Sequence, residues 1–80
     1  MMPIRPITAT GDTFSTSDPL LVIDWLVQVE GFALVADAPD RIALAKEGQV
    51  IRLTSDGVVS VGGEDAARAA RLLLLHSEEG

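Results

Sequence analysis

The sequence predicts an α+β fold in which a four-stranded antiparallel meander carries two antiparallel helices on one face, in the order α-β-β-β-β-α. Two observations predict it. Apolar residues alternate with other residues in four short runs between Phe32 and Val61, and a turn sequence separates each run from the next. Segments with helical periodicity stand on either side of these runs. A chain of 80 residues is long enough for one small domain with a single core.

The N-terminal region is the least regular part of the chain. Pro3 and Pro6 exclude a helix there, so residues 1–16 form either a short strand at an edge of the sheet or a partly ordered tail. We therefore place a single α+β domain at residues 17–77. The polar, acidic residues 78–80 are expected to fray.

The first helix has recognisable signals at both ends. Asp18 is a favourable N-cap, and Pro19 suits the first helical position, where its missing N–H costs nothing. Gly31 is a typical C-terminal stop, so we predict a helix over residues 20–30. Its core-facing residues would be Val22, Trp25, Leu26 and Val29.

The loops of the meander predict its register, because opposite residues in an antiparallel pair share a face of the sheet. A two-residue loop at Glu47 and Gly48 brings apolar residues opposite each other, and so does a three-residue loop that ends at Gly57. The predicted pairs are Leu44 with Ile51, Ile42 with Leu53, Leu53 with Val59, and Ile51 with Val61. Agreement between independent turns supports the assignment.

The first loop of the meander, at residues 38–40, is also predicted to have three residues. It would pair Leu34 with Leu44, Ala36 with Ile42, and Asp37 with Arg41. On this register eight side chains share the face that the helices cover. They are Phe32, Leu34, Ile42, Leu44, Ile51, Leu53, Val59 and Val61.

The second helix is predicted to begin after Gly62 and Gly63, where Glu64 and Asp65 suit the positive end of the helix dipole. Its core-facing residues would be Ala66, Ala69, Ala70, Leu73 and Leu74. The small residues among them would allow the helix to lie close to the sheet.

The uncovered face of the sheet is the first candidate for a partner-binding surface. Its predicted residues are Ala33, Val35, Ala43, Ala45, Val50 and Arg52. A solvated face usually carries more long polar side chains than this one does. A flat partner, a second copy of the chain or the N-terminal tail could lie on it, and an alanine-rich sheet without a partner is the alternative.

The outer surface of the helices is the second candidate, for partner binding or for dimerisation. Its predicted residues are Leu20, Leu21, Asp24, Val27, Leu72 and Leu75. Exposed leucines at this density indicate a homodimer formed through the helices. The alternative is that apolar residues of the N-terminal tail fold back and cover them.

Composition argues against several classes of function. The formal net charge of −6 disfavours direct binding to nucleic acid, and the absence of cysteine excludes disulfides and thiolate metal sites. His76 is the only histidine and lies near the end of a helix, so we predict no enzyme, no metal site and no cofactor. The apolar segment near Leu20 is too short to span a bilayer and contains Asp24, which predicts a cytoplasmic protein without membrane contact.

These patterns predict a small protein-protein interaction module that acts through a preformed sheet or helix surface, as a homodimer. One alternative is an acidic inhibitor or decoy, of the sort that mobile elements encode, which blocks a nucleic-acid-binding enzyme. The acids Asp18, Asp24 and Glu30, with no base among residues 17–31, favour this alternative. Another alternative is a small chaperone that holds an extended client on the sheet.

Overall fold

The computed structural model describes residues 2–78 and confirms the α+β class. Within these residues the elements are, in chain order, β1 (Ile4–Pro6), β2 (Thr13–Thr16), α1 (Pro19–Gln28), β3 (Ala33–Ala38), β4 (Arg41–Lys46), β5 (Gln49–Thr54), β6 (Val58–Gly62) and α2 (Ala66–Leu75). The six strands form one antiparallel sheet in the order β1-β2-β6-β5-β4-β3. The predicted four-stranded meander is therefore the β3–β6 part of a larger sheet.

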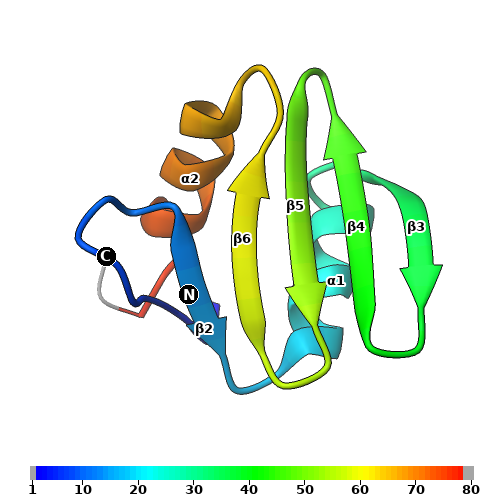
Figure 1. The fold of residues 1–80 in the computed structure, drawn as a ribbon, viewed down its shortest axis with the longest axis horizontal. Helices are drawn as coiled ribbons and strands as arrows, with labels where there is room; N and C mark the ends of the chain where they lie inside the picture. The colour runs from blue at the N-terminus through cyan, green and yellow to red at the C-terminus, as the bar shows by residue number, and fades with distance from the viewer. Residues whose placement is uncertain (1, 79–80) are drawn as a thin grey trace.

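Both helices lie on the same face of the sheet and run in opposite directions (Figure 1). Helix α1 lies behind β4 and β5, and α2 lies behind the part of the sheet that contains β6 and β2. Strand β3 lies beyond α1, at one margin of the sheet. No helix among residues 2–78 covers the other face, which we call the open face.

The N-terminal residues extend the sheet instead of lying across it. Strand β2 pairs with β6 so that Phe14 stands opposite Val59, and β1 pairs in turn with β2. Both Ile4 and Phe14 are fully buried, because their side chains point to the face that the helices cover. The predicted edge strand at the N-terminus is thus present, with a second strand between it and the meander.

Helix α1 begins as predicted but ends earlier. The carboxylate of Asp18 accepts a hydrogen bond from the backbone N–H of Leu21 at 3.2 Å, and Pro19 is the first helical residue. The helix ends at Gln28 rather than at residue 30, and Val29 is exposed instead of facing the core. The chain leaves the helix axis at Val29 and turns at Gly31, where φ is 81°, so that Phe32 returns to the core.

The two later turns of the meander confirm the predicted register. Leu44 stands opposite Ile51, and Ile51 in turn stands opposite Val61. Gly57 has a φ of 91°, as the three-residue loop requires. Glu47 and Gly48 have φ values of 47° and 81°, which are typical of a two-residue hairpin loop.

The pairing of β3 with β4 differs from the prediction. Leu34 does stand opposite Leu44, but the register then shifts at a β-bulge between Leu34 and Ala36. Beyond the bulge the observed pairs are Ala36 with Ala43, Asp37 with Ile42, and Ala38 with Arg41. Since the bulge takes up one extra residue, the loop keeps only Pro39 and Asp40. The predicted pairs of Ala36 with Ile42 and of Asp37 with Arg41 are therefore wrong.

The core contains most of the predicted residues, with two corrections besides Val29. Leu34 was predicted to face the helices in the core, but it is half exposed because α1 does not reach β3. On α2, Leu72 packs against the core and Leu74 is exposed, which reverses the prediction. The rings of Trp25 and His76 lie 5.0 Å apart, so the inner stripe of α2 continues through His76 and not through Leu74.

Candidate functional site

Strand β3 is exposed on both faces and along one side. Among the described strands it pairs only with β4, so its other side presents unpaired backbone N–H and C=O groups to solvent. Leu34 and Val35 are 50% and 60% exposed, and Ala33, Ala36 and Asp37 are exposed as well. We call this strand side, with the side chains of residues 33–38, the β3 edge. The β3 edge is a largely apolar strand side with which another strand could pair, and nothing within residues 2–78 covers it.

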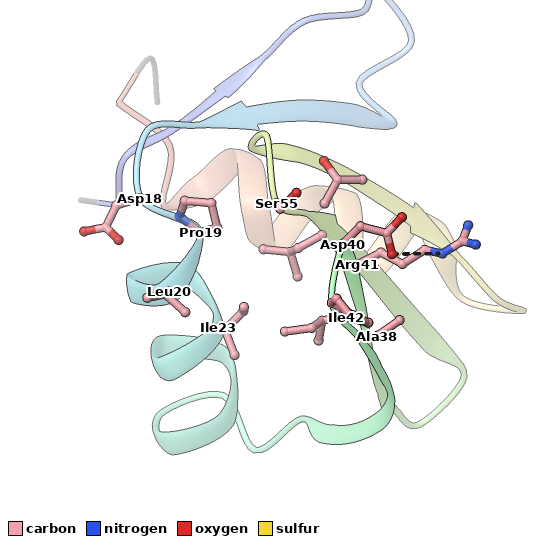
Figure 2. Close-up of a pocket in the computed structure, with 12 residues that line it drawn as sticks. Asp18, Pro19, Leu20, Ile23, Ala38, Asp40, Arg41, Ile42 and Ser55 are labelled. Atoms are coloured by element: carbon pink, nitrogen blue, oxygen red, sulfur yellow. Dashed lines mark ion pairs between the residues drawn. The ribbon is translucent and has the colours of Figure 1, made fainter.

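A cleft of about 340 Å³ lies beside the β3 edge, between the start of α1 and the loop that joins β3 to β4. Its apolar lining consists of Pro19, Leu20, Ile23, Ala38, Pro39, Ile42 and Leu53. Figure 2 shows Ile23 of α1 and Ile42 of β4 projecting toward each other across this space. The cleft is large enough for one or two apolar side chains, and we call it the α1 cleft.

The β3 edge and the α1 cleft are parts of one continuous region. Ala38, the last residue of β3, lines the cleft, and Leu34 shares the helix-covered face with Leu44. On the helix, Leu20 lines the cleft and is 77% exposed. A chain segment lying along the β3 edge could therefore place side chains in the cleft.

The charges near this region are almost all negative. Residues 6–40, which include α1 and β3, contain no lysine or arginine. Their six acids are Asp12, Asp18, Asp24, Glu30, Asp37 and Asp40, and they account for the whole formal net charge of −6. In the rest of the chain acids and bases balance. Asp12 lies in the turn between β1 and β2, at the far side of the sheet, and the other five acids belong to α1, β3 or the segments next to them. The region that carries the β3 edge is thus strongly acidic.

Two basic side chains border the acidic region, and each already has a partner. Arg41 lies 4.0 Å from Asp40, in an ion pair whose two side chains are both largely exposed. At the opposite end of β3, the ammonium group of Lys46 donates a hydrogen bond of 2.6 Å to the carbonyl oxygen of Glu30. It also lies 5.9 Å from the centre of the Phe32 ring. Neither base lies within β3 itself.

The predicted sheet-face residues lie together, apart from Val35. Ala33, Ala45 and Val50 form one row across the open face, and Ala43 and Arg52 belong to the next. Val35 is the extra residue of the bulge, so Ala36 takes its place opposite Ala43. The same shift pairs Asp37 with Ile42 instead of Arg41, so Asp37 shares the helix-covered face with Ile42.

The open face consequently has a different charge from the region around α1. Arg41 and Arg52 are on it, and strands β3–β6 contribute no acid to it. The guanidinium group of Arg52 lies close to Gly62, where an added Cβ would be only 2.9 Å from its Nη1 atom. Residues 2–16 leave this face bare, because they form β1 and β2 at the far side of the sheet.

The predicted helix-face residues do not form one patch. Leu20, Leu21 and Asp24 are exposed on α1, while Val27 and Leu72 pack against the core. Leu75 of α2 is 72% exposed, and its exposed neighbour is Leu74. The alternative that the N-terminal region covers these leucines is not supported, because Ile4 and Phe14 are buried in the sheet layer instead.

The described residues show no cluster suited to metal binding. No group of three or more His, Asp or Glu side chains within residues 2–78 could hold a metal ion. His76 packs against Trp25, away from the α1 cleft. Neither of the two helices in this part of the chain has the length and apolar character needed to cross a membrane.

One carboxylate has a perturbed pKa, and it lies in the turn between β1 and β2. The Asp12 carboxylate accepts hydrogen bonds from the hydroxyl groups of Thr10 at 2.8 Å, Thr8 at 3.0 Å and Thr13 at 3.3 Å. These bonds favour the charged form and lower the pKa of Asp12 below its ordinary value of 3.8. The group is fully exposed and orders the turn, with no feature of a catalytic acid.

The structure reveals functional candidates that sequence reasoning missed. Ile23, Ile42 and Leu53 line the α1 cleft, but the sequence pattern marks Ile42 and Leu53 only as core residues. Comparisons with protein-family models, with curated proteins and with solved structures find no match to this chain. The candidate site is therefore defined by its own geometry and charge.

Proposed function

We propose that this protein is a non-enzymatic interaction module that binds an extended segment of another protein by strand addition at the β3 edge. The observation that supports this most directly is the exposure of β3, a six-residue apolar strand whose second side has no partner within residues 2–78. An added strand would satisfy the unpaired backbone groups of β3.

The α1 cleft gives such a complex a source of selectivity. In strand addition, main-chain hydrogen bonds supply affinity and pockets for alternate side chains supply specificity. The cleft lies on the helix-covered side of the β3 edge, where every second side chain of an added strand would point. An inhibitor and a small client-binding chaperone could both use this arrangement, because they differ in the partner and not in the mode of binding.

A selection from a random peptide library displayed on phage tests the proposal, with the full chain as bait. We expect the selected peptides to slow hydrogen exchange at those amides of residues 33–38 that point away from β4, because strand addition places these N–H groups in hydrogen bonds. Peptides that protect only the open face or α2 would contradict strand addition. A selection that enriches no peptide would contradict it as well.

Two substitutions at one exposed position give a matched comparison. Val35→Lys should weaken the selected peptides at least about tenfold, because a lysine on an edge strand opposes pairing. Val35→Thr keeps a β-branched side chain and should bind as the parent protein does. Both variants should unfold within about 0.5 kcal/mol of the parent, since Val35 is 60% exposed. Equal peptide affinity for the two variants would count against the β3 edge.

A homodimer is a second candidate, and the exposed Leu74 and Leu75 of α2 support it. A dimer formed through these leucines would leave the β3 edge accessible. Light scattering should then give a solution mass of two chains, and Leu75→Glu should reduce it to one. A single-chain mass for the parent protein at high concentration would contradict the homodimer.

A further inference from the structure

We infer that the segment bound at the β3 edge is cationic, with apolar side chains alternating with lysine or arginine. This inference depends on the proposed strand addition and adds to it the chemistry of the partner. Two features select that chemistry: the concentration of acids around α1 and β3, and the apolar lining of the α1 cleft.

An added strand would meet a negatively charged surface beside β3. Asp37 is the only charged residue of β3, and residues 6–40 contain no basic residue. The bulge pairs Asp37 with Ile42 and so places Asp37 on the same side of the sheet as the α1 cleft. Asp18 and Asp40 also line the cleft, and the one basic residue in its lining, Arg41, is paired with Asp40. A basic partner would neutralise this surface, whereas an acidic partner would be repelled.

The side chains of an added strand would alternate between the two faces of the sheet. Successive residues of a strand point to opposite faces, so an added segment would offer every second side chain to the helix-covered face. On that face it would meet Leu34, which is half exposed, and the apolar part of the cleft. The aliphatic stem of a lysine or arginine can pack on this apolar surface while its charged end reaches Asp37 and the acids of the cleft. Apolar side chains at the positions between would lie over the open face, where strands β3–β6 contribute no acid.

The same charges disfavour a second copy of this chain as the occupant. Two copies paired through β3 about a twofold axis would bring the same acidic region together twice, including both copies of Asp37. Like charges opposite each other across paired strands are destabilising. The two bases that border β3, Arg41 and Lys46, are already engaged with Asp40 and with the carbonyl oxygen of Glu30, so they do not offset this repulsion.

Three synthetic octapeptides with blocked ends test the inference. One alternates valine with lysine, the second alternates valine with threonine, and the third alternates valine with glutamate. We expect the lysine peptide to bind at least about tenfold more tightly than the threonine peptide and the glutamate peptide not to bind. Raising the ionic strength from low to physiological values should weaken the lysine peptide several-fold, because salt screens exposed charges.

Two acid-to-amide variants locate the charge effect. Asp37→Asn should weaken the lysine peptide about two- to fivefold and leave the threonine peptide unchanged, as expected for one exposed charge pair. Glu64→Gln is the matched control, because Glu64 is exposed and lies outside residues 6–40. It should bind the lysine peptide as the parent protein does.

The outcomes separate this inference from the proposed function. If the lysine and threonine peptides protect the amides of residues 33–38 equally and without salt dependence, the cationic partner is wrong but strand addition stands. If the lysine peptide binds without protecting these amides, both proposals fail. Protection of residues 33–38 in the protein alone, together with a two-chain mass, would show that a second copy occupies the edge and would overturn the inference.

Discussion

The two edges of the sheet are built in opposite ways. Strand β1 has three residues, ends in Pro6 and is preceded by Pro3. The chain after α2 closes this edge. The N–H of Glu78 donates a 3.0 Å hydrogen bond to the carbonyl of Ile4, and the N–H of Met2 donates a 2.7 Å bond to the carbonyl of His76. Strand β3 has six residues, no proline and a single charge.

This difference shows which edge is available for binding. Proteins usually protect edge strands from pairing with other chains by making them short, by placing proline or charges on them, or by covering them. Strand β1 has three of these features: it is short, it contains proline, and its Arg5 pairs with Glu78 at 3.3 Å. Strand β3 has only a bulge and Asp37. The protein closes the β1 edge and leaves the β3 edge open. This difference is the reason for proposing strand addition at β3.

The largest effect is expected from truncating one apolar side chain at each edge. Ile4→Ala should lower the free energy of unfolding by about 3 kcal/mol, because Ile4 is fully buried and leaves a cavity. Leu34→Ala should cost less than about 1 kcal/mol, because half of Leu34 is already in water. Urea unfolding of both variants measures the difference. Equal losses would show that the two edges are packed alike.

A somewhat smaller effect is expected at the turn that holds β2 against the meander. A Cβ at Gly57 would overlap the carbonyl oxygen of Thr16, and its φ of 91° is unfavourable for other residues. Gly57→Ala should cost about 2 kcal/mol or more and expose the β2 amides to exchange. At Gly48 the φ is also positive, but a Cβ would make only ordinary contacts, so Gly48→Ala is the milder control. A reversed ranking would contradict this account of the β2 side.

The smallest effect is expected from Asp12 in the turn between β1 and β2. Because folding lowers the pKa of Asp12 below 3.8, its contribution to stability is present above that pH and is lost as the pH falls through the lowered value. The stability difference between the parent protein and Asp12→Asn should therefore shrink toward zero in acid. Chemical unfolding between neutral and acidic pH measures it. A difference that grows in acid would mean that the pKa is raised.

Local signals in the sequence predicted the local structure correctly. Asp18 and Pro19 start α1, Gly57 adopts the positive φ that its loop requires, and Leu44 stands opposite Ile51. Each depends on residues close together in the chain, so turn and cap chemistry are sufficient to predict it. The β-bulge before Ala36 has no comparable signal, and the predicted pairing of β3 with β4 failed at that point.

The candidate site could be predicted only in part. Val35 and Leu20 were recognised as exposed apolar residues, and the structure places both at the β3 edge or the α1 cleft. Leu34 was assigned to the core, because the sequence does not show that α1 stops short of β3. The cleft was missed because its walls come from α1 and the loop between β3 and β4, whose separation depends on how the helix packs on the sheet.

The amino-acid sequence by itself determined the two helices, the meander and the face that the helices cover, because alternation, caps and tight turns act over a few residues. Only the tertiary structure decided that Phe14 and Ile4 complete the other side of the sheet and that β3 remains at its edge. The order of the strands depends on contacts between residues that are distant in the sequence, because several segments could pack against the same face or edge of the meander. The stretch of chain with unbalanced acids includes β3, which among the described strands is paired on one side only, and this combination identifies the binding surface that we propose.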